Sequence, residues 1–162
     1  LDGLMMGTRS GSLDAGVLLF LLEQGWTHAQ IEKLLYKRSG LLGVSGISAD
    51  SRELLESDRL EAQQALDLFP FRIAGEVARL ATTLGGLHAL VFTAGVGENQ
   101  PRIRAAVCAR LAWLRLELDE PANAANAATI SSPSSPIAAF VIATDEEQVI
   151  ADEALSILDI RI

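Results

Sequence analysis

Residues 91–99 read VFTAGVGEN, an apolar strand that runs directly into a glycine turn ending in polar side chains. A turn of this kind can present bare backbone amides to a phosphate or a nucleotide. Glycine turns after strands are also common where the chain merely reverses, so this segment alone leaves both interpretations open. The run over residues 89–93 is short and almost continuously apolar, which predicts a buried parallel strand.

Helical and strand patterns alternate on both sides of this segment, which predicts an α/β fold. We expect helices over residues 14–24, 27–38, 59–84, 101–111 and 147–158, and strands over 114–118 and 137–142 with a short one near 129–131. Ser12 or Asp14 can cap the first helix, and Thr27 opens the second with a capping box. Residues 41–51 are rich in glycine and serine and predict a loop. Pro70 should kink the long helix or split it.

Two polar turns follow predicted strands, at residues 95–99 and 144–147. Sheets in α/β proteins bind ligands at the carboxyl ends of their strands. A cleft shared by the two turns is therefore expected, and a third loop around residues 50–52 would close it.

Composition narrows the possible functions. The 162 residues suit one ordinary domain or two small subdomains, and the net charge of −8 argues against a broad affinity for nucleic acid or anionic lipid. No apolar run approaches the roughly 18 residues of a membrane span, and the start of the sequence has no signal-peptide pattern, which favours a cytoplasmic protein. The single cysteine, Cys108, follows an apolar pattern and is expected to be a buried packing residue. The start without methionine suggests a fragment or a processed product.

Several residues could take part in phosphoryl transfer, which needs positioned cations, a Mg²⁺ held by a carboxylate and a nucleotide cradle. Arg9, on a loop over residues 7–11 that is expected to be flexible, could clamp a phosphoryl group, or it could be a solvated loop arginine. Asp50 and Arg52 could equally be a helix cap and a surface charge. Glu146 could bind Mg²⁺ or simply complement a helix dipole.

Four other arginines suit solvated helix faces better than phosphate binding. They are Arg72, Arg79, Arg102 and Arg104.

Four motifs, in this order along the chain, together resemble one family, the acetate kinases (acetate and propionate kinases of the acetokinase group). They are residues 3–11, GLMMGTRSG; residues 39–46, SGLLGVSG; residues 91–99, VFTAGVGEN; and residues 144–147, TDEE. The resemblance spans essentially all 162 residues, yet acetate kinases are more than twice this long, so it covers only their C-terminal part.

The resemblance implies a fold and an activity. The fold is that shared by acetate and sugar kinases, Hsp70 and actin (ribonuclease H-like), in which two related α/β domains close on a nucleotide. Residues 1–162 would form the single C-terminal, nucleotide-binding domain, with the N-terminal domain absent from this chain. The family works as a homodimer. With Mg²⁺ it transfers phosphate reversibly from ATP to acetate, which gives ADP and acetyl phosphate.

The resemblance also implies residue roles. Arg9 matches the arginine that stabilises the transition state, and Glu146 matches the Mg²⁺-site glutamate, with Glu147 beside it as an alternative. The nucleotide-binding residues implied are Asp50, Ser51 and Arg52 on the adenosine side and Gly95, Val96, Gly97, Glu98 and Asn99 in the nucleotide loop.

The sequence departs from the family pattern at a few positions. Ser12 and Ala15 replace an aspartate and a proline, Ala143 stands where a proline often occurs, and Pro70 interrupts what resembles a continuous family helix. Ser12 can still cap a helix, so the helix start is expected to survive, and Pro70 bears on local helix geometry rather than on the site.

The N-terminal part would supply the substrate pocket and the catalytic aspartate, and rate depends on positioned groups from both sides. We therefore expect this chain alone to bind nucleotide weakly and to turn over negligibly. Two alternatives remain open: a non-catalytic nucleotide-binding or dimerisation module, such as a truncated copy, and a propionate or butyrate kinase of the same fold.

Overall fold

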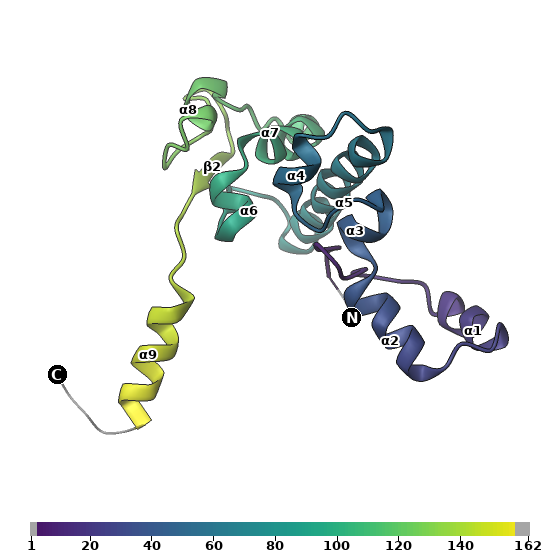
Figure 1. The fold of residues 1–162 in the computed structure, drawn as a ribbon. Helices are drawn as coiled ribbons and strands as arrows, with labels where there is room; N and C mark the ends of the chain where they lie inside the picture. Colours follow the sequence, from purple (N-terminus) through teal and green to yellow (C-terminus); the bar gives the residue numbers. More distant parts are fainter. Residues whose placement is uncertain (1–2, 158–162) are drawn as a thin grey trace.

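The computed structural model of the chain describes residues 3–157. Helices dominate, and a small sheet lies in the second half of the chain (Figure 1). In chain order the elements are α1 (Ala15–Glu23), α2 (His28–Lys37), α3 (Gly40–Ser45), α4 (Ser51–Leu55), α5 (Leu60–Leu84), β1 (Ala89–Phe92), α6 (Ala94–Asn99), α7 (Pro101–Arg110), the 3-10 helix η1 (Ala112–Leu114), α8 (Glu120–Ala124), β2 (Ala138–Val141) and α9 (Glu146–Ile157).

The sheet pairs β1 with β2 in parallel, in a register that runs from Ala89 opposite Ala138 to Phe92 opposite Val141. Both strands were predicted, and the α/β fold class is confirmed. Because the strands are parallel neighbours, the turns that follow them leave the sheet at the same edge.

The main core lies between α5 and the helices packed on it. It contains Leu41 of α3, Leu54 of α4, Leu66 and Phe69 of α5 and Ile103 of α7. The helix α5 is uninterrupted over 25 residues with Pro70 inside it, so of the two predicted outcomes, a kink or a split, the split does not occur. A proline within a helix removes one backbone hydrogen bond, at a cost of about 3 kcal/mol. Burial of several apolar side chains, each worth about 1.5–3 kcal/mol, offsets that cost.

Helix boundaries follow the predicted caps. Asp14 caps α1 by accepting a hydrogen bond from the backbone N–H of Gly16, Thr27 opens α2 with a complete capping box, and Pro101 occupies the first turn of α7. Asp145 accepts from the backbone N–H of Gln148 at the start of α9. The predicted end of that last helix, Leu158, lies outside the described residues.

Two segments predicted to be irregular are helical in part, although residues 46–50 do form the predicted loop that leads into α4. Residues 41–51 begin with α3, and the predicted glycine turn at residues 95–99 is part of α6. At the start of α3 the N–H groups of Leu41 and Leu42 donate to the carbonyls of Met6 and Gly7, both at 2.9 Å. A distant loop thus takes the place of a local cap, which sequence patterns cannot show.

The strand predicted over residues 114–118 is also wrong for the most part. Leu114 ends the 3-10 helix η1, and Arg115 adopts a left-handed conformation with φ of 68°. Leu118 forms only an isolated antiparallel bridge, to Ser131. The short strand expected near residues 129–131 is likewise reduced to isolated bridges, one of them between Thr129 and Phe140.

Cys108 is a buried packing residue, as predicted, with only 2% of its surface exposed. Burial, and to a lesser extent the charge of Glu120, raises the pKa of its thiol to about 11. Such a thiol is a poor nucleophile at neutral pH.

The helices α1 and α9 project from the body on different sides (Figure 1). Neither contributes a buried residue, and both expose apolar side chains such as Phe20 and Ile150. Among the described residues, no helix combines the length and apolar character that a membrane crossing requires.

The contact between Gly40 and residues 6–9 yields a test. Gly40 has φ of 63°, and a Cβ atom there would lie 2.0 Å from the Met6 carbonyl oxygen. Gly25 also has a positive φ, of 80°, but a Cβ atom there would meet nothing within 4 Å. Gly25→Ala should therefore cost only the strain of a left-handed alanine, about 1–2 kcal/mol, whereas Gly40→Ala should lower the free energy of unfolding by more than about 3 kcal/mol. Chemical denaturation measures both, and equal losses would contradict the close packing of this loop.

Candidate functional site

A cavity of about 580 Å³ lies where three segments distant in sequence meet. It is bounded by residues 4–7 of the N-terminal loop, by residues 49–51 before α4, and by residues 93–96 at the junction of β1 and α6. Leu41 and Phe69 complete its lining. Four of the predicted nucleotide-binding residues therefore border one cavity: Asp50, Ser51, Gly95 and Val96.

Gly95 borders this cavity, and no packing against other protein atoms requires a glycine at this position. Its φ is not in the left-handed range, and a Cβ atom there would have nothing within 4 Å. Gly97 differs, because a Cβ atom there would approach the backbone carbon of Phe92 to 3.1 Å. Protein packing thus accounts for Gly97, while Gly95 leaves its backbone bare toward open space.

The chain enters α6 through Ala94, which adopts φ of 59°. A non-glycine residue with this φ is uncommon and costs about 1–2 kcal/mol. Strained residues of this kind concentrate at functional sites. Ala94 lies next to Gly95, just after the carboxyl end of β1.

Across the cavity, Asp50 is both a helix cap and an ion-pair partner. Its carboxylate accepts from the backbone N–H of Arg52 at 2.9 Å and from the Arg52 Nε at 3.0 Å. Hydrogen bonding by the Arg52 side chain, followed by that of its backbone N–H, lowers the pKa of Asp50 to about 2. The pair is therefore ionised throughout the neutral pH range.

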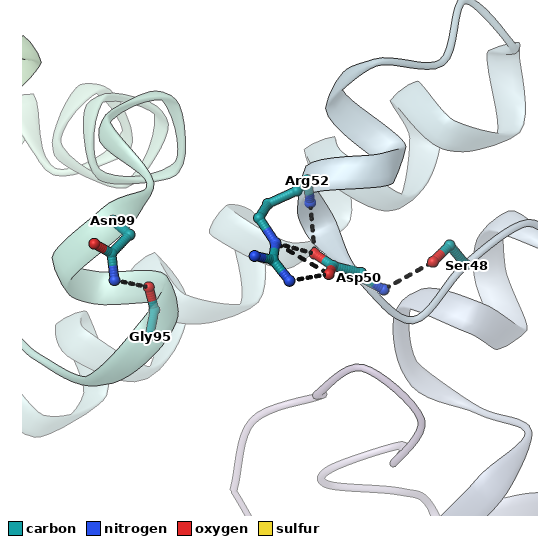
Figure 2. A network of polar contacts seen from close by, with 5 residues as sticks. All are labelled: Ser48, Asp50, Arg52, Gly95 and Asn99. Atoms are coloured by element: carbon teal, nitrogen blue, oxygen red, sulfur yellow. Dashed lines mark hydrogen bonds and ion pairs between the residues drawn. The ribbon is translucent and has the colours of Figure 1, made fainter.

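Figure 2 shows the Arg52 side chain extending from α4 toward the side on which Gly95 and Asn99 lie. The Asn99 amide donates to the Gly95 carbonyl at 3.1 Å. Arg52 and Asn99 thus each have one internal partner and stay exposed.

The two polar turns predicted to share a cleft are linked directly, but only residues 95 and 96 of them border the cavity described above, and residues 144–147 do not. The Glu98 carboxylate accepts from the backbone N–H of Thr144 at 3.1 Å and from its hydroxyl at 3.3 Å. This contact ties α6 to the turn between β2 and α9. The Glu98 side chain therefore joins two elements of the fold, a role that its sequence context did not indicate.

Glu146 and Glu147 lie exposed in the first turn of α9. The described residues contain no group of three or more histidine, cysteine, aspartate or glutamate side chains that could hold a metal ion. A single carboxylate still suits Mg²⁺, which usually keeps several waters and binds one or two carboxylates together with substrate phosphates. Glu146 could therefore be one ligand of a site completed by other groups.

Arg9 is half-buried, and its loop is held rather than flexible. The Met6 N–H donates to the Arg9 carbonyl, and the Ser39 N–H to the Thr8 carbonyl, both at 2.9 Å. Its guanidinium Nη2 contacts the Met6 sulfur at 3.4 Å, while its Nε is buried with no hydrogen-bond partner among the described residues. Arg9 does not border the cavity of about 580 Å³.

The prediction that Arg104 lies on a solvated helix face is wrong, because its side chain is 0% exposed. Arg72, Arg79 and Arg102 are exposed as expected. The side chains that accept from Arg104, Asn123 and Asn126, lie 19 and 22 residues further along the chain, and its nearer partners are backbone carbonyls, so no local pattern signals its burial.

A second cavity, of about 570 Å³, lies between the end of α4 and the start of α5. Arg59 and Arg102 border it, and none of the predicted site residues does.

Comparisons with known proteins agree on one family. The family model described as the acetokinase family matches residues 1–152. The acetate kinase of Rhodopseudomonas palustris (strain TIE-1) is 53% identical, in a match covering 98% of this chain and 41% of that protein. The acetate kinase of Rickettsia akari (strain Hartford) is 45% identical, again over 98% of this chain and 41% of the relative.

Solved structures resemble the fold over nearly the whole chain. The acetate kinase of Porphyromonas gingivalis has a TM-score of 0.87 at 41% identity, covering 97% of this chain and 41% of that one. A propionate kinase from Francisella tularensis subsp. tularensis SCHU S4 has a TM-score of 0.88 at 38% identity, covering 94% of this chain and 40% of that one. The chain thus spans about two fifths of the length of the relatives it matches, and it belongs to the acetokinase family.

Proposed function

We propose that this chain is the nucleotide-binding part of an acetate kinase, which transfers phosphate reversibly between ATP and acetate to give ADP and acetyl phosphate. Membership of the acetokinase family supports the class of reaction. The observation that carries the nucleotide site is the bare backbone of Gly95, which faces the same cavity as Asp50 and Ser51.

In this proposal, the nucleotide lies between α4 and α6. Gly95 lets the ligand approach the backbone closely, and Val96 supplies apolar contact at the cavity wall. Arg52 and Asn99 offer hydrogen-bond donors from opposite sides. Gly97 and Glu98 act mainly by shaping α6, through the packing on Phe92 and the contact with Thr144.

Arg9 is the proposed stabiliser of the transferring phosphoryl group. Its unpartnered Nε leaves hydrogen-bonding capacity unused in this chain. Charge spreads over the phosphoryl oxygens in the transition state, and a guanidinium suits that planar, spread charge. Glu146 would help to hold the Mg²⁺ that neutralises phosphate charge when it is bound.

The proposal places the remaining machinery outside this chain. Residues 1–162 would be one domain, and an N-terminal domain would supply the carboxylate pocket and further phosphate contacts. The complete enzyme would be a cytoplasmic homodimer. Because positioned groups from both sides set the rate, the isolated chain should bind nucleotide weakly and turn over negligibly.

A propionate kinase is the second candidate. The similarity to the Francisella tularensis propionate kinase supports it as much as the similarity to acetate kinases does. The two differ by one methylene in the acceptor, a difference that a pocket discriminates by only about 1–3 kcal/mol.

Calorimetry with MgADP tests the nucleotide site. Gly95→Ala should keep the fold, since a Cβ atom there meets no protein atom, yet weaken binding about tenfold or more by occupying the space of the ligand. Gly75→Ala is the matched control, because that glycine also lies in a helix with nothing within 4 Å and does not border the cavity. Arg52→Ala and Asn99→Ala should each lose roughly tenfold in affinity. Equal affinity in wild type and all variants would remove the assignment.

The role of Arg9 is tested in a full-length protein that contains this chain. Arg9→Ala should lower kcat by about 10³-fold with little change in nucleotide KM, because the contact would form only in the transition state. Arg38→Ala, at the nearby end of α2, serves as the control for charge. The 162-residue chain alone is the negative control and should form no measurable acetyl phosphate. An unchanged kcat in Arg9→Ala, or robust turnover by the chain alone, would contradict this part of the proposal.

A further inference from the structure

Arg104 of α7 is a fully buried cation whose five N–H donors are all used. Its Nε donates to the Asn123 side-chain oxygen at 2.8 Å. Its Nη1 donates to the carbonyls of Gly97 at 2.8 Å and Glu98 at 2.9 Å. Its Nη2 donates to the Asn123 carbonyl at 2.7 Å and to the Asn126 side-chain oxygen at 2.6 Å. The guanidinium therefore joins α6, α7 and the α8 region through one planar group.

Two of these acceptors, the Gly97 and Glu98 carbonyls, lie in the last turn of α6. A helix of six residues leaves its last carbonyls without partners inside the helix. The Nη1 group satisfies two of them at once, and its positive charge complements the negative end of the helix. Arg104 thus ends and orients the helix whose other end, at Ala94 and Gly95, borders the cavity.

The opposite half of the guanidinium is held as firmly. Asn123 is 2% exposed, and its amide also donates to the Pro101 carbonyl at 2.9 Å. Asn126 adopts φ of 52°, a conformation that asparagine tolerates better than most residues. The acceptors are therefore fixed before a ligand arrives.

Stability alone does not explain this arrangement. No acidic side chain in the described part of the chain lies within ion-pair distance of Arg104, and burial lowers the pKa of its guanidinium. Burying an ion is expensive, and apolar residues of similar volume often stabilise a protein as well or better. What a planar five-donor group adds is a fixed geometry.

We propose that Arg104 is a positioning residue for the nucleotide site: it fixes the C-terminal end of α6, so that Gly95 keeps its place at the cavity and Asn99 keeps its hydrogen bond to the Gly95 carbonyl. This inference rests on the proposed function, because it concerns the same site. Arg104 itself is buried behind α6 and does not border the cavity. Small displacements of contacting groups are costly in such sites, so loosening α6 should weaken nucleotide binding without removing a contact.

The test compares Arg104→Lys with Val107→Ala in the 162-residue chain. Lysine keeps the charge but has three donors, so it cannot serve five acceptors. Val107 lies three residues further along α7, is 0% exposed and packs in the core with Ala74 and Leu111. Both variants should lower the melting temperature. At a temperature where both are folded, an NMR titration should show MgADP affinity reduced roughly tenfold in Arg104→Lys only.

Two further variants keep the test decisive. Asn126→Gly retains the left-handed backbone but removes one acceptor of Arg104, and it should weaken binding by a smaller factor even if Arg104→Lys fails to fold. If Arg104 acts through α6, the loss caused by Asn99→Ala should shrink in the Arg104→Lys background, whereas a general loss of stability leaves the two effects additive.

The outcomes separate this inference from the proposed function. Wild-type affinity in both Arg104→Lys and Asn126→Gly, or an equal loss in Val107→Ala, would overturn the positioning role while Gly95→Ala still reports on the site. Absence of any MgADP binding by the wild-type chain would overturn both.

Discussion

The parallel pairing of β1 and β2 is the constraint on which the site depends. The register from Ala89 opposite Ala138 to Phe92 opposite Val141 brings both carboxyl ends to one edge of the sheet. The turn after β1 leads into α6 and the turn after β2 into α9. Antiparallel pairing would have sent these turns to opposite edges, and the contact between Glu98 and Thr144 could not form.

Three contacts from different directions then hold α6 in place. Gly97 packs against the backbone of Phe92, Glu98 is hydrogen-bonded to Thr144, and Arg104 donates to two carbonyls in the last turn of the helix. Contacts within the protein thus explain the residues at positions 97 and 98 of α6. No packing contact explains why position 95 is a glycine, and its bare backbone faces the cavity bordered by Asp50. The proposed nucleotide site explains this glycine, because a residue without a side chain lets the ligand approach the backbone closely.

Local signals in the sequence predicted local structure well. The apolar runs of β1 and β2, the caps at Asp14 and Thr27, and Pro101 at a helix start all act within a few residues of where they are read. The failures depend on partners far along the chain. The helix α3 replaces a predicted loop because Met6 and Gly7 satisfy its first N–H groups.

The site divides in the same way. The approach of the segments around Asp50 and Gly95 could be predicted from the α/β pattern, because Gly95 follows a strand of the sheet and Asp50 precedes a helix. The specific roles of Arg9 and Glu146 came from the family resemblance and remain predictions. The burial of Arg104 could not be predicted, since the side chains that accept from it, Asn123 and Asn126, lie 19 and 22 residues away and its nearer acceptors are backbone carbonyls.

The central claim is that a nucleotide lies between α4 and α6, and mapping its binding by amide NMR tests this most directly. On titration of the chain with MgADP, the account predicts that the largest shifts fall on residues 50–52 and 95–99, with smaller ones at the Glu98 partner Thr144. Largest shifts around the second cavity, at Arg59 and Arg102, would contradict it, as would a titration that moves no amide of α6.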